Sequence, residues 1–149
     1  MRFSIALAAV AVVLLSGCAG GRSPAAPRDW KPLPGASDAW TNGSGPSEQE
    51  YSYVRKPFEG SLQDLASVVT IDALLRHRGA KSNGTAPLAA CPGLAAVATF
   101  TLPDDSILQE GFTVRNGASV RVTYARPAGA RVDFNAAAAM QEALCSRPG

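Results

Sequence analysis

Hydrophobic and polar positions alternate along three segments in the second half of the chain. The segments 94–102, 107–114 and 119–125 alternate or run apolar and are enriched in Val, Phe, Thr and Tyr, which predicts strands. Asn116-Gly117 separates the last two and is a strong hairpin signal, because both residues accept a positive φ. We therefore expect an antiparallel meander of three strands.

A strand and a long helix are predicted before this meander. The β-rich segment 50–56 ends at Pro57. Ser61 and Asp64 have the spacing of a helix capping box, which predicts a helix over 61–75. The apolar positions of this helix share one wide arc that we expect to face the sheet: Leu62, Leu65, Ala66, Val68, Val69, Ala73 and Leu75.

A short helix is predicted at the carboxyl end, over 136–145, capped by Asp133 or Asn135. The order β-α-β-β-β-α predicts a single small α+β domain over 48–147, an antiparallel sheet with helices packed on it. In outline this order resembles cystatin-like folds and the PsbP/Mog1-like fold. The resemblance concerns shape alone and implies no site residues.

The amino terminus has the pattern of a secretory leader. Met1-Arg2 is a short basic start and Ile5–Leu15 is an apolar run, which is too short for a spanning helix. The sequence Leu15-Ser16-Gly17-Cys18 then resembles the lipobox of bacterial lipoproteins. This resemblance implies that residues 1–17 are a signal peptide, that Cys18 carries the lipid and that the membrane is one partner. The alternative is an ordinary signal with Cys18 as a structural thiol.

The predicted location follows from this leader. The lipid would hold the chain on a membrane outside the cytoplasm. The residue after the lipidated cysteine is Ala19 and not aspartate, and the lipoprotein resemblance then implies the periplasmic face of the outer membrane in a bacterium with two membranes. The net charge of +2 is too small to indicate nucleic acid as a partner.

Residues 18–47 have the Gly-, Pro- and Ser-rich composition of a tether. Trp30 and Trp40 do not fit a plain linker, because large aromatic side chains are costly to leave in water. Two interpretations stay open. The tryptophans pack on their own domain, or they belong to a partner-binding segment, for example for another envelope protein.

Two cysteines remain once Cys18 is assigned to lipid. An even pair in an oxidising compartment predicts a Cys91–Cys145 disulfide. A redox pair would need C-x-x-C spacing, and a zinc site is not expected because His77 is the only histidine. The sequence indicates no cofactor.

Asp72 interrupts the apolar arc of the long helix, and Arg76 follows four positions later. A buried aspartate must be paired or hydrogen-bonded, so we expect an Asp72–Arg76 pair or a bond to a loop amide. The alternative is a polar group on the floor of a ligand pocket between helix and sheet.

Four arginines cluster around one hairpin and the strand that leaves it: Arg115, Arg121, Arg126 and Arg131. Two interpretations stay open, a solvated surface, which we favour, and a basic rim.

Three functional hypotheses follow. The first is a lipid-anchored, non-enzymatic binding or assembly accessory of the cell envelope. The second is a small-ligand carrier with a pocket floored by Asp72. The third is an enzyme using His77 as its base, although the sequence contains no G-x-S-x-G motif, phosphate loop or metal-binding run.

Overall fold

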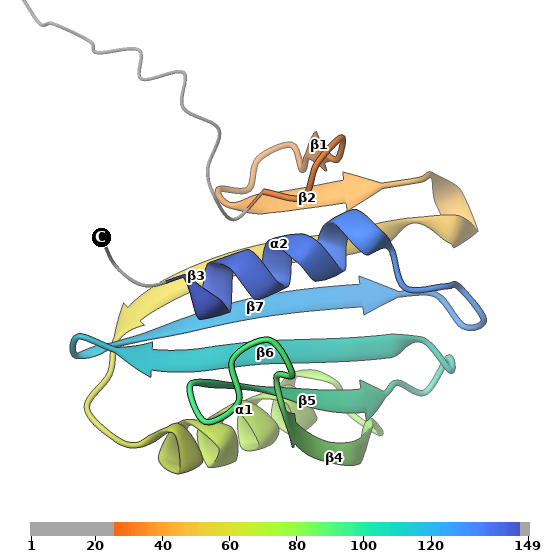
Figure 1. Ribbon diagram of the computed structural model, residues 1–149. Coiled ribbons are helices and arrows are strands. Elements are labelled where there is room, and N and C mark those ends of the chain that lie inside the picture. The colour runs from red at the N-terminus through yellow and green to blue at the C-terminus, as the bar shows by residue number, and fades with distance from the viewer. Residues whose placement is uncertain (1–25, 147–149) are drawn as a thin grey trace, which may run out of the picture.

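The computed structural model describes residues 26–146, which form a seven-stranded antiparallel sheet and two helices (Figure 1). The strands lie in the order β1-β2-β3-β7-β6-β5-β4. The elements are β1 (Lys31–Pro32), β2 (Ala39–Asn42), the 3-10 turn η1 (Gly45–Ser47), β3 (Gln49–Pro57), α1 (Leu62–Arg76), β4 (Lys81–Pro87), β5 (Ala95–Thr101), β6 (Ile107–Arg115), β7 (Ala118–Arg126) and α2 (Phe134–Cys145).

The predicted α+β class and the antiparallel meander are confirmed. β5, β6 and β7 pair as consecutive hairpins, and Asn116-Gly117 turns between the last two with positive φ at both residues. The strand expected first is β3, which pairs with β7 in the centre of the sheet. Three strands were not predicted from the sequence. They are β1, β2 and β4, which form the two outer parts of the sheet.

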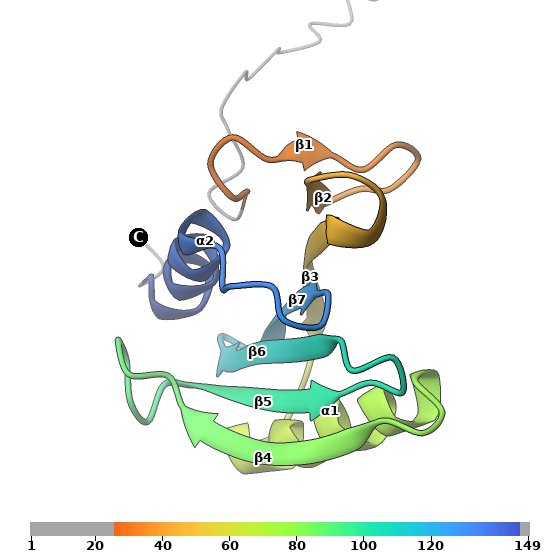
Figure 2. The ribbon, with the colours of Figure 1, turned by 90° about the vertical axis from the view of Figure 1, so that its right-hand side faces the viewer.

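The two helices cover opposite faces of the sheet (Figures 1 and 2). Side chains alternate along each strand, so that Ala95 on β5 packs in the cluster with α2, whereas Ala96 packs in the cluster with α1. α1 lies on β4, β5 and β6, and α2 lies on β6 and β7. The α1 face of β2, β3 and β7 therefore has no helix on it.

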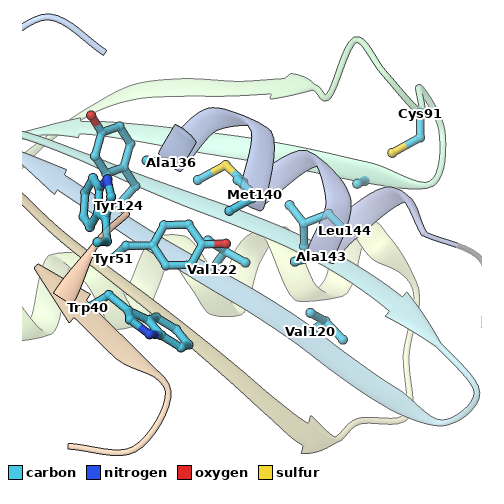
Figure 3. Close-up of a cluster of buried hydrophobic side chains, with 13 residues drawn as sticks. Trp40, Tyr51, Cys91, Val120, Val122, Tyr124, Ala136, Met140, Ala143 and Leu144 are labelled. Atoms are coloured by element: carbon cyan, nitrogen blue, oxygen red, sulfur yellow. The ribbon is translucent and has the colours of Figure 1, made fainter. Parts of the chain in front are cut away.

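The face under α2 holds an aromatic cluster (Figure 3). Trp30 lies edge-on to the rings of Tyr51 and Tyr124, with ring centroids 6.3 and 6.1 Å away, an arrangement that aromatic pairs favour. Gly111 on β6 lets α2 approach closely. A Cβ atom built there would lie 2.6 Å from a Leu144 methyl carbon.

α1 begins as predicted but buries a narrower arc. Ser61 and Asp64 form the reciprocal capping box. Val68 and Leu75, expected in the core, are 46% and 78% exposed. The physical reason is that α1 lies on one half of the sheet only, so residues on the flank of its apolar arc have no strand beneath them. The fully buried positions are Leu65, Val69 and Ala73.

The predicted tether contains sheet structure from its middle onward. β1 and β2 extend the sheet beyond β3, and Trp30 and Trp40 are buried at 7% and 9% exposure. Trp30 Nε1 also donates a hydrogen bond to Asp133 Oδ1, 3.3 Å away, at the residue that caps α2. Both tryptophans pack on their own domain, so the alternative of a partner-binding segment is wrong for these side chains.

Candidate functional site

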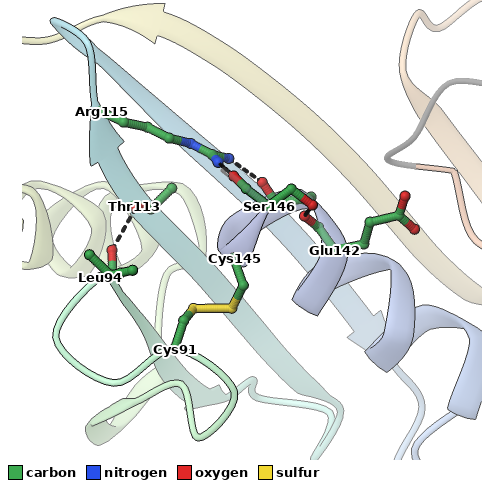
Figure 4. Close-up of a disulfide and its surroundings, with 8 residues drawn as sticks. Cys91, Leu94, Thr113, Arg115, Glu142, Cys145 and Ser146 are labelled. Carbon is green, nitrogen blue, oxygen red and sulfur yellow. Dashed lines mark hydrogen bonds between the residues drawn. A yellow bond between two sulfur atoms is a disulfide. The ribbon is translucent and has the colours of Figure 1, made fainter. Parts of the chain in front are cut away.

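A disulfide fixes the carboxyl-terminal helix to the loop before β5 (Figure 4). Cys91 and Cys145 are joined as predicted, with their Cα atoms 5.7 Å apart and 54 residues between them in sequence. Arg115 at the β6–β7 hairpin donates hydrogen bonds to the backbone carbonyls of Ala143 and Ser146. These bonds satisfy carbonyl groups at the helix end that have no partner within the helix.

The four arginines expected in one basic rim are separated, and Arg131 lies exposed in the loop between β7 and α2. Arg115 binds the end of α2, at the hairpin end of β7. Arg126 lies at the other end of that strand, where it hydrogen-bonds Gln109 and lies over the Tyr124 ring. Arg121 faces α1, and alternation along β7 explains why it is on a different face from Arg126.

The α1 face contains a groove where β3 and β7 have no helix on them. It encloses about 270 Å³. Its lining comes from β3 (Ser52, Val54 and Lys56), from α1 (Asp72 and Arg76) and from β7 (Arg121 and Thr123). A second hollow of about 210 Å³ shares Ser52 and Thr123 with the first, so the uncovered sheet surface continues from α1 to β2.

A buried glutamate organises the wall of this groove. Glu110 on β6 is fully buried. Its Oε1 accepts a hydrogen bond from Arg76 Nη2 at 3.0 Å, and its Oε2 accepts one from Thr123 Oγ1 at 3.0 Å. Arg121 Nη2 lies 3.6 Å from the same Oε2. Charged partners on two sides offset the cost of taking the carboxylate out of water.

Asp72 on α1 pairs with the same two arginines as Glu110. Its Oδ2 is 3.0 Å from Arg76 Nη2 and 2.8 Å from Arg121 Nη2. Desolvation by itself raises the pKa of Asp72, but the hydrogen bond from Arg121 and the charges of both arginines outweigh it, so the pKa is lowered. The predicted Asp72–Arg76 pair is present. The Asp72 side chain is 39% exposed, so it forms part of the groove wall and not the floor of an enclosed pocket.

The role of Glu110 was not predicted from the sequence, although the sequence contains a signal for it. Glu110 lies between Leu108 and Phe112 at every second position of β6, so all three share one face, and both apolar residues are buried under α1. Period-two spacing therefore places the glutamate on an apolar face, and a buried acid requires a partner. The partner could not be read from the chain, because Arg121 and Arg76 come from β7 and from α1.

Most of the charged groups at the groove are paired with one another. Three basic and two acidic side chains line the groove or lie beneath it. Four of them form ion pairs with one another: Arg76, Arg121, Asp72 and Glu110. Lys56 forms no ion pair within residues 26–146. His77, the candidate base, is the carboxyl-terminal cap residue of α1 and lies outside the groove lining.

The part of the chain that the structure describes contains no group of three His, Cys, Asp or Glu side chains that could hold a metal ion. Within the same residues no helix is long and apolar enough to cross a membrane. Cys18 and the predicted signal peptide lie outside the described residues. A comparison with models of known protein families gives no match, and a comparison with curated protein sequences gives none either.

Proposed function

We propose that this chain is a lipid-anchored, non-enzymatic protein of the cell envelope that binds a partner through the groove beside α1. The lipobox-like sequence at Leu15–Cys18 supports the anchor. The Cys91–Cys145 disulfide supports a location outside the cytoplasm, because disulfides persist in oxidising compartments.

The observation that carries the binding proposal is the uncovered half of the sheet on the α1 side. Sheets of α+β domains normally bury their apolar faces under helices. Here Val54 on the central strand β3 remains 42% exposed, and two hollows meet at Ser52 and Thr123. Such a surface can receive a segment of another protein without any change in the fold.

The groove also defines the chemistry of its partner. Val54 offers an apolar contact and Lys56, two residues along the same face, offers a positive charge. Asp72, Arg76 and Arg121 already satisfy one another. A partner segment with an apolar side chain and a nearby carboxylate fits these positions, with the carboxylate paired to Lys56.

Site-specific photo-crosslinking of the full chain in its membranes tests this proposal. A benzophenone amino acid at position 54 should capture a protein, and Lys56→Glu should abolish the capture. Arg55 is the matched control, since it is an exposed base on the same strand whose side chain leaves the opposite face. Equal capture from positions 54 and 55, or no effect of Lys56→Glu beside Arg55→Glu, would contradict the proposed groove.

The anchor has a separate test. Labelled palmitate should enter the wild-type chain and not a Cys18→Ser variant. Retention of label in the variant would refute the lipid anchor without affecting the groove.

A small-ligand carrier is the second candidate, because the groove lies where the sequence analysis placed a pocket. Its volume of about 270 Å³ is slightly below the range of about 300–1,000 Å³ common for ligand sites. Native mass spectrometry of the chain released gently from membranes separates the two proposals. A bound small molecule lost in Lys56→Glu favours the carrier, and a bound protein favours the accessory.

A further inference from the structure

The outward side of α1 carries an apolar seam that the fold leaves in water. We define this seam as Val68, Ile71 and Leu75, which are 46%, 59% and 78% exposed. Leu74 beside them is 39% exposed. A contiguous group of exposed apolar side chains is a mark of an interaction surface, whereas single exposed apolar residues are normal.

The spacing of the seam is that of two packed helices. Val68, Ile71 and Leu75 follow one another at intervals of three and four residues, the repeat with which helices pack side by side. The seam is nearly symmetric, because Val68 lies three residues before Ile71 and Leu75 lies four residues after it. In an antiparallel pair whose two-fold axis passes beside Ile71, the two Ile71 side chains lie next to each other and Val68 lies next to Leu75, so one surface is complementary to itself.

The charges at the ends of α1 favour the same arrangement. Glu59 and Asp64 lie at its amino end, and Arg78 and Lys81 follow its carboxyl end. An antiparallel pair brings the acids of one helix to the bases of the other and opposes the two helix dipoles. An anionic membrane surface presents a single sign of charge and would repel the acidic end.

We infer that α1 is the interface of a homodimer, in which a second copy of this chain packs its α1 antiparallel against the seam with two-fold symmetry. This goes beyond the proposed function, because it concerns the outer side of α1 and not the groove. A stable interface buries about 800 Å² on each partner, so the polar residues on both sides of the seam must contribute to it.

Cysteine crosslinking of the full chain in intact cells tests both contact and orientation. Ile71→Cys should give a disulfide-linked dimer under mild oxidation. Chains with Val68→Cys should crosslink to co-expressed chains with Leu75→Cys, and each of these variants should crosslink poorly to itself. Ala138→Cys is the control, because Ala138 is an exposed residue of α2 on the other face of the sheet.

Three outcomes overturn the inference. The first is no more dimer from Ile71→Cys than from Ala138→Cys or the wild-type chain. The second is efficient self-crosslinking of Val68→Cys and of Leu75→Cys, which would mean parallel helices. The third is a blue shift of an environment-sensitive dye on Ile71→Cys when vesicles of anionic lipid are added, with no dimer, which would assign the seam to a membrane surface.

Discussion

Replacement of Glu110 by glutamine removes one charge from the fully buried position beneath the groove wall. The side chain keeps its size, so no cavity forms. It loses its charge-assisted hydrogen bond from Arg76 at 3.0 Å and its ion pair with Arg121 at 3.6 Å. The amide nitrogen can donate to the Thr123 hydroxyl, but it also brings a donor toward an arginine, which cannot accept.

The expected cost follows from the surroundings. Removing one partner of a buried ion pair typically costs about 3–5 kcal/mol, because the other charge is left buried and unpaired. Here Arg76 remains 47% exposed, and both arginines keep Asp72 as a partner. We therefore expect a smaller loss, about 2–3 kcal/mol, close to the value of hydrogen bonds to charged groups.

Urea unfolding of the full chain in detergent measures this loss. The fluorescence of Trp30 and Trp40 reports unfolding, because both are buried in the core. Glu142→Gln is the matched control. Glu142 is exposed on α2, so the same substitution there should change the free energy of unfolding by less than about 0.5 kcal/mol.

A double-mutant cycle sharpens the result. Arg121→Gln combined with Glu110→Gln should cost less than the sum of the two single variants, by about 1 kcal/mol or more. A loss below about 0.5 kcal/mol for Glu110→Gln at an unchanged denaturant slope would contradict a stabilising role for this carboxylate. The carboxylate would then not be the group that holds the groove wall.

Three further predictions concern the fold and the groove. Cys145→Ser opens a loop of 54 residues and should lower the free energy of unfolding by about 4 kcal/mol in the chain-entropy estimate, measured by urea unfolding. Gly111→Ala should destabilise by about 1–3 kcal/mol through overpacking against Leu144, and Leu144→Ala should relieve part of that loss. Because the folded-state pKa of Asp72 is lowered from 3.8, its stabilising contribution is present above that pH and is lost as the pH falls through the lower folded value. Asp72→Asn should therefore flatten the acid limb of the unfolding free energy, and an unchanged acid limb would exclude the Asp72–Arg121 contact as its cause.

The elements that local chemistry specifies were predictable from the sequence. The Ser61–Asp64 capping box fixes the start of α1, and Asn116-Gly117 fixes a hairpin, because both signals act within a few residues. The Cys91–Cys145 pair was predictable by elimination, once Cys18 was assigned to lipid. Even the long-range contact of α2 with the loop before β5 followed from that pairing.

Tertiary structure alone decided which apolar residues are buried and where charges meet. Val68 and Leu75 fit an apolar arc, but whether they are covered depends on how much of the sheet lies under α1. The Gly- and Pro-rich composition around Trp30 and Trp40 gives no strand signal. β1 and β2 form all the same, because they are stabilised by pairing beyond β3 and by the aromatic core. Glu110 meets Arg121 and Arg76 only because β6, β7 and α1 pack together. Such contacts depend on sheet order and helix placement, which no local pattern in the chain encodes.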